Sequence, residues 1–130
     1  MPRFSSYSLE RLSTCDIRLQ DLFLRVVENF DCKVTCGHRT EEAQNKAYSE
    51  GRSKVEWPNS RHNSTPSQAV DIAPYPINYS DTRRFCYFAG FVLGTAQAMG
   101  IKIRWGGDWD QDTEVLDNKF NDLMHFELVP

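Results

Sequence analysis

The stretch Gln68-Ala-Val-Asp-Ile-Ala73 predicts a short strand, because it is rich in small and β-branched residues and prolines follow it closely. In an extended chain Ala69, Asp71 and Ala73 share one face, and the residues between them share the other. A carboxylate in such apolar surroundings is costly to bury unless it is paired with a cation or binds a metal. The stretch therefore predicts both a sheet and a polar site that contains Asp71.

Apolar periodicity and turn residues on either side of this strand predict the remaining elements. These are a helix from about 14 to 29, a strand at 32–36, a helix at 41–50, a helix from about 81 to 99, a strand at 101–105 and a last strand at 125–129. Polar loops are expected at 52–66 and 106–121. This order indicates an α+β fold with a small antiparallel sheet and about three flanking helices, in a single domain over residues 1–130.

Composition restricts the class of protein. The chain has 130 residues, 40% of them hydrophobic and 25% charged, as expected for one folded domain. A net charge of −3, with no basic stripe, argues against nucleic-acid binding. No stretch approaches the roughly 20 apolar residues that membrane insertion requires. The amino-terminal residues lack the apolar core of a signal peptide, so we expect a cytosolic protein, monomeric by default, with reduced cysteines.

Two of the three histidines lie where Asp71 could join them. His62 is in the polar loop before the Asp71 strand, and His125 begins the final strand with Glu127 on the same face. Two imidazoles, one carboxylate and a water make an open zinc site. The remaining open position would hold the nucleophile.

Such a site also needs a proton acceptor and a cation for the developing oxyanion. Asp122 or Glu127 can accept the proton, although Asp122 faces the other way in a straight strand and reaches His125 only if the chain turns near Leu123. Arg39, at a strand-to-helix corner, is the available cation.

These residues lie in segments that resemble a known family. Ser60-Arg-His62, Ala69-Val-Asp71 and Asp122-Leu-Met-His125-Phe-Glu127 resemble the signatures of zinc peptidoglycan peptidases. These are the D-Ala-D-Ala carboxypeptidases and L-alanyl-D-glutamate endopeptidases that share the hedgehog/DD-peptidase fold. Gly37-His-Arg39-Thr40, Asp71-Ile-Ala-Pro-Tyr75 and Trp105-Gly-Gly-Asp-Trp109 also fit. Over roughly residues 14–129, the chain is most similar to phage endolysins of the L-alanyl-D-glutamate type.

The resemblance implies a role for each matched residue. His62, Asp71 and His125 would bind one Zn²⁺, Asp122 would be the general base, Arg39 would stabilise the oxyanion, Ser60 would contact a ligand residue or the substrate, and Asp108 and Trp109 would line the cleft. Zinc-bound water would attack the L-alanine carbonyl, and Asp122 would pass its proton to the D-glutamate nitrogen. Strand geometry keeps Glu127 as the alternative base. The substrate would be bacterial peptidoglycan, and the protein would remain in the host cytoplasm until released to the cell wall.

One departure from the family pattern supports a second hypothesis. The interval from His62 to Asp71 is two residues longer than usual, and Asn63-Ser-Thr-Pro-Ser67 replaces the turn glycine. This feature favours a non-catalytic zinc- or peptidoglycan-binding module on the same fold. A D,D-carboxypeptidase is the other alternative, against which Asp122, the 105–109 segment and the short chain argue.

Overall fold

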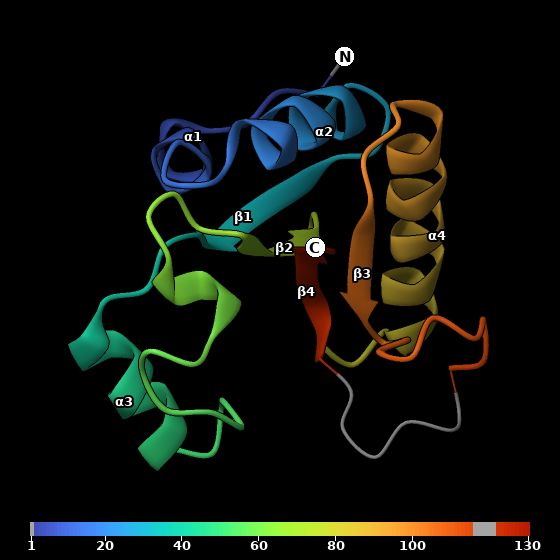
Figure 1. Ribbon diagram of the computed structural model, residues 1–130. Coiled ribbons are helices and arrows are strands. Elements are labelled where there is room, and N and C mark those ends of the chain that lie inside the picture. Colours follow the sequence, from blue (N-terminus) through green and yellow to red (C-terminus); the bar gives the residue numbers. More distant parts are fainter. Residues whose placement is uncertain (1, 116–121) are drawn as a thin grey trace.

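The computed structural model describes residues 2–115 and 122–130 (Figure 1). Within them lie the helices α1 (Ser6–Leu12), α2 (Ile17–Val27), α3 (Glu41–Ser49) and α4 (Thr82–Ala98), the strands β1 (Cys32–Cys36), β2 (Ala69–Pro74), β3 (Ile103–Gly106) and β4 (Asp122–Leu128), and a 3-10 turn, Arg61–Asn63. The predicted α+β class is confirmed. The fold differs from the prediction by one additional helix, α1, in which only Ser8 and Leu12 are buried.

The described strands form one antiparallel sheet in the order β1-β2-β4-β3. The two central strands place Asp71 directly opposite His125. The predicted alternation holds along β2, since Val70 and Ile72 join the hydrophobic core while Asp71 faces the other side. The sheet thus has an apolar face and a face that carries polar side chains.

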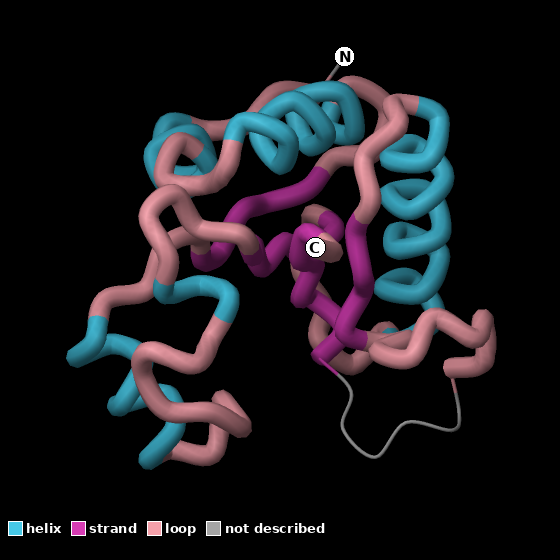
Figure 2. Tube along the Cα trace, viewed as in Figure 1, coloured by secondary structure: helices cyan, strands magenta, loops and turns pink. Residues whose placement is uncertain are grey.

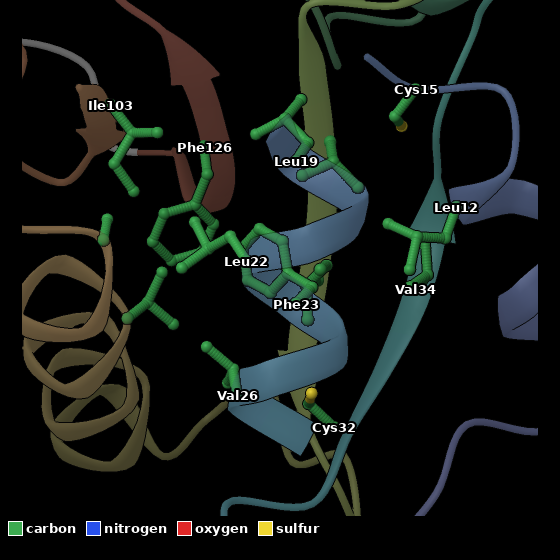
Figure 3. Packing of buried hydrophobic residues seen from close by; sticks show 14 of the residues in the cluster. Leu12, Cys15, Leu19, Leu22, Phe23, Val26, Cys32, Val34, Ile103 and Phe126 are labelled. Atoms are coloured by element: carbon green, nitrogen blue, oxygen red, sulfur yellow. The ribbon is translucent and has the colours of Figure 1, made fainter. Parts of the chain in front are cut away.

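Helices α2 and α4 cover the apolar face of the sheet (Figure 2). The apolar stripe predicted on the first long helix is buried, and it packs around Phe126 of β4 (Figure 3). The ring of Phe126 lies 5.6 Å from that of Phe23 on α2 and 6.2 Å from that of Phe88 on α4, both edge to face. This packing anchors β4, and with it His125, one residue before Phe126.

Several element boundaries differ from the predicted ones. The first long helix begins at Ile17 because the Asp16 carboxylate caps it, accepting from the Arg18 N–H at 2.9 Å. The third strand begins at Ile103, since Gly100 and Ile101 still bond to the end of α4. Strand β4 begins at Asp122, three residues earlier than predicted, because it continues to pair with β3 across an irregular register. Residues 116–121 of the predicted 106–121 loop lie outside the described residues.

No helix among the described residues combines the length and the apolar character needed to cross a bilayer.

Candidate active site

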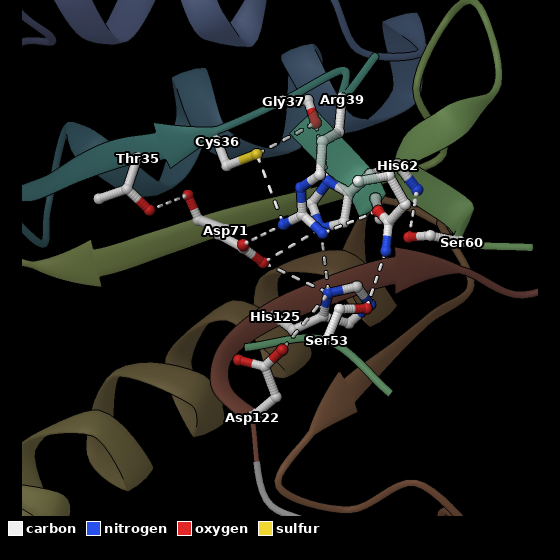
Figure 4. A network of polar contacts seen from close by, with 12 residues as sticks. Thr35, Cys36, Gly37, Arg39, Ser53, Ser60, His62, Asp71, Asp122 and His125 are labelled. Atoms are coloured by element: carbon white, nitrogen blue, oxygen red, sulfur yellow. Dashed lines mark hydrogen bonds and ion pairs between the residues drawn. The ribbon is translucent and has the colours of Figure 1, made fainter. Parts of the chain in front are cut away.

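The two histidines and the aspartate meet in one buried cluster (Figure 4). His62 Nε2, Asp71 Oδ1 and His125 Nδ1 form a triangle in which every side is 3.3 Å. Ligand atoms placed tetrahedrally at zinc bond lengths of about 2.0–2.1 Å are about 3.3 Å apart. The donor types and their separation therefore fit a zinc ion with three protein ligands.

Strand pairing and a 3-10 turn position these three side chains. Asp71 and His125 are register partners on β2 and β4. His62 stands in the 3-10 turn, which Ser60 caps by accepting from the His62 N–H at 3.2 Å. The longer interval between His62 and Asp71 forms a loop. The end of this loop is held against the 14–16 segment, because Ser67 donates a backbone hydrogen bond to Thr14 and accepts one from Asp16.

Two further contacts orient the imidazole rings. His62 Nδ1 lies 2.7 Å from the Gly37 carbonyl oxygen, and His125 Nε2 lies 2.7 Å from Glu127 Oε1. Each oxygen accepts a ring N–H, so His62 Nε2 and His125 Nδ1 keep their lone pairs for a metal. This is the arrangement by which metal-binding histidines are normally held.

Glu127 lies on the Nε2 side of the His125 ring, whereas the ligand triangle lies on the Nδ1 side. Its other oxygen accepts from Arg104 Nη2 at 2.6 Å, and Arg61 Nε is 3.9 Å away. With only 4% of its surface exposed, Glu127 is fixed by these neighbours. Its position favours an orienting role over that of the alternative base.

Without a metal, protons occupy this cluster. Burial alone would lower the pKa of His62, but the Asp71 carboxylate beside it raises that pKa to about 10. Burial likewise opposes the charged form of His125, yet its hydrogen bonds to Asp71 and Glu127 raise its pKa. Burial would raise the pKa of Asp71, but the two imidazoles hold it well below its usual range. Metal binding at neutral pH must therefore displace protons.

Asp122 stands beside the cluster, with Oδ2 4.0 Å from His125 Nδ1. The irregular pairing of β3 and β4 at Gly106 supplies the turn that this approach requires. Burial raises the pKa of Asp122, and the negative charge of Asp71 raises it further. A carboxylate with a raised pKa is better matched to accepting a proton near neutral pH.

Arg39 lies in the segment that connects β1 to α3. Its Nη2 lies 3.5 Å from Asp71 Oδ2, and its Nη1 donates to Gln44 Oε1 at 2.9 Å. Gln44, which was not predicted as a site residue, is fully buried and also donates to Ser53 Oγ and the Val55 carbonyl. Gln44 lies three residues before Ala47, on the same face of α3, and this spacing could have indicated that the glutamine is buried.

A cavity of about 830 Å³ opens over the cluster. Besides the residues above, it is lined by the 52–55 and 59–61 segments on one side and by Trp109, Asp110 and Met124. Ser60 and Trp109 therefore both line this cavity, and the Trp109 ring is 5.3 Å from that of His125.

Asp108 does not lie where it was predicted. It lines a neighbouring pocket, and its two carboxylate oxygens accept the backbone N–H groups of Asp112 and Thr113. Asp110 lines the main cavity in its place.

Comparisons with known proteins agree on one family. The model of the family described as phage L-alanyl-D-glutamate peptidase matches residues 1–129. The L-alanyl-D-glutamate peptidase of Escherichia phage T5 is 30% identical over 138 aligned positions, which cover 98% of each chain. The crystal structure of Serratia marcescens L-Ala D-Glu endopeptidase ChiX has the same fold, with a TM-score of 0.77 at 22% identity over 98% of this chain and 91% of that one.

Proposed function

The chain belongs to the phage L-alanyl-D-glutamate peptidase family, and we propose that it cleaves peptidoglycan as a zinc-dependent endolysin. Family membership makes it a hydrolase of the L-Ala–D-Glu amide bond in the stem peptide. The zinc ion, the roles of the individual residues and the timing of release to the wall are the proposal.

His62, Asp71 and His125 would hold the zinc ion. The observation that carries this assignment is the triangle of donor atoms 3.3 Å apart, with each imidazole oriented by an acceptor on its other nitrogen. When bound, zinc lowers the pKa of water and polarises a carbonyl group.

Asp122 and Arg39 would perform the proton and charge steps. Asp122 accepts a proton from the water that adds to the L-alanyl carbonyl carbon, and it returns that proton to the D-glutamyl nitrogen as the C–N bond breaks. The Arg39 guanidinium stabilises the negative charge that develops on the carbonyl oxygen. The products are a new carboxylate on L-alanine and a free amino group on D-glutamate.

Bacterial peptidoglycan is the substrate in this proposal. The enzyme would act as a monomer and would stay in the host cytoplasm until it is released to the wall. The rival within the enzyme class, a D,D-carboxypeptidase, does not agree with the family match.

A non-catalytic module on the same fold is the remaining rival, and Asp122→Asn separates it from the enzyme. We expect the variant to keep one zinc ion per chain and to lose about 10²- to 10⁴-fold in kcat on purified muropeptides, the range for removal of a general base. Loss of zinc from the variant would contradict our placement of Asp122 outside the ligand set. Zinc-loaded wild-type protein that cleaves nothing would favour the binding module.

A further inference from the structure

If the protein cuts the L-Ala–D-Glu bond, as the proposed function states, its substrate carries different groups on the two sides of that bond. D-glutamate has two carboxyl groups, and only one can form the next amide bond of the stem peptide. The other remains as a free carboxylate close to the scissile nitrogen. The alanyl side offers only a methyl group near the bond.

The cavity is also asymmetric in charge. One side is formed by the 52–61 segment, which lines the cavity with Arg52, Lys54 and Arg61. Trp109 and Asp110 line it from the segment that follows β3. Figure 1 shows the two segments, in green and in orange, on either side of β4. A carboxylate is attracted to the first side and repelled by Asp110 on the second.

The cationic side is built into the fold. Gln44 donates to Ser53 Oγ at 2.8 Å and to the Val55 carbonyl at 2.7 Å. The backbone N–H groups of Arg52 and Ser53 both donate to the Ala47 carbonyl at the end of α3. These bonds fix the backbone on both sides of Lys54. They also tie this segment to the active site, because Gln44 accepts from Arg39 as well.

The arginines of the cavity differ in the hydrogen bonds and ion pairs that they make within the protein. Arg39 is bound to Asp71 and Gln44, and Arg61 Nη2 donates to the Leu128 carbonyl at 2.6 Å. Arg52 contacts Glu50 at 2.7 Å, but its side chain is 59% exposed. An exposed ion pair of this kind contributes little to stability, so the guanidinium can exchange its contact with Glu50 for one with a substrate carboxylate.

We propose that Arg52 and Lys54 bind the free carboxylate of the D-glutamyl residue. This contact orients the stem peptide across the cavity, with its D-glutamyl side on the 52–61 segment and its alanyl side toward Trp109 and Met124. The two cations are specificity-determining residues, because they distinguish a carboxylate from an uncharged carboxamide at the same position of the substrate.

A pair of synthetic stem peptides tests this assignment. One has the free carboxylate on the D-glutamyl residue and the other has a carboxamide there. We expect zinc-loaded wild-type enzyme to favour the carboxylate peptide about tenfold in kcat/KM, as one charge-assisted hydrogen bond predicts. The double variant Arg52→Gln/Lys54→Gln should reduce that ratio to about one, mainly by raising KM for the carboxylate peptide.

Arg18→Gln is the matched control. Arg18 also pairs with a carboxylate two residues earlier, Asp16, and is similarly exposed, but it does not line the cavity. For Arg18→Gln, the ratio of kcat/KM between the carboxylate and carboxamide peptides should equal that of the wild type. A wild-type ratio near one, or a double variant that slows both peptides equally, would overturn the inference. If zinc-loaded wild type cleaves neither peptide, the proposed function fails and this inference fails with it.

Discussion

Replacing Glu127 with glutamine tests the contact that orients His125. The Glu127 carboxylate accepts from His125 Nε2 at 2.7 Å and from Arg104 Nη2 at 2.6 Å, and its side chain is 5% exposed. Glutamine keeps the size of the side chain but removes its charge. It can present a carbonyl oxygen to only one of these two donors.

The structure sets the size of the effect. Burial disfavours the charged form of Glu127, but the hydrogen bonds from His125 and Arg104 lower its pKa from 4.5 to about 2. At about 1.4 kcal/mol per pKa unit, these contacts favour the carboxylate by roughly 3 kcal/mol. Because the pKa is depressed in the folded state, this stabilisation is present above about pH 4.5 and is lost as the pH falls through about 2.

We therefore expect E127Q to lower the free energy of unfolding of the metal-free protein by roughly 3 kcal/mol at pH 7, and by roughly half as much at pH 3. Zinc affinity should fall about 10- to 100-fold, the usual effect of losing a carboxylate that orients a histidine ligand. Urea denaturation of chelator-treated protein measures the first effect, and competition with a chromophoric chelator measures the second.

The substitution Glu10→Gln, at an exposed position on α1, is the control and should change neither quantity. Unchanged stability and zinc affinity in E127Q would show that the Glu127 carboxylate neither stabilises the folded protein nor orients His125 for a metal. A variant that keeps its zinc but loses turnover would identify Glu127 as the base in place of Asp122.

Three other predictions follow from the same geometry. In the metal-free protein His62 has a pKa of about 10, so zinc must displace a proton from its imidazole. Calorimetry should therefore find that zinc affinity rises by up to about tenfold per pH unit between roughly pH 6 and 9. An affinity that does not change with pH would contradict this. Gly37→Ala places a methyl group against Thr14 Oγ1 and the Arg11 carbonyl, so thermal denaturation should show a loss of about 1–3 kcal/mol; an unchanged Tm would refute the clash. Arg39→Lys should lower kcat about 10²- to 10³-fold with KM little changed in peptide-hydrolysis assays, and a pure KM effect would argue against an oxyanion role.

The alternation of residues along the strands made the cluster of two histidines and Asp71 predictable. Val70 and Ile72 are buried in the core while Asp71 faces the histidines, as the two-residue period of a strand requires. Phe126 and Leu128 alternate with His125 and Glu127, and this alternation placed His125 on a strand in the same way. Local sequence carries this kind of information, since each residue's face follows from its neighbours.

Contacts between distant elements were not predictable in the same way. Helix α1 is short, and the buried Ser8 hydroxyl accepts the Val34 N–H of β1, a tertiary contact with no local signal. Arg104 reaches Glu127 because β3 and β4 place them opposite each other, and that register cannot be derived from either strand alone. Gln44 likewise joins segments that only the folded chain brings together.

Mass-spectrometric analysis of muropeptides digested with the purified protein, with and without a chelator, tests directly whether the protein cleaves the L-Ala–D-Glu bond with the help of zinc. We expect products with a free amino group on D-glutamate and a new carboxylate on L-alanine. The chelator should abolish these products and added Zn²⁺ should restore them. Release of terminal D-alanine, or cleavage that persists in the chelated protein, would contradict zinc-dependent cleavage of this bond.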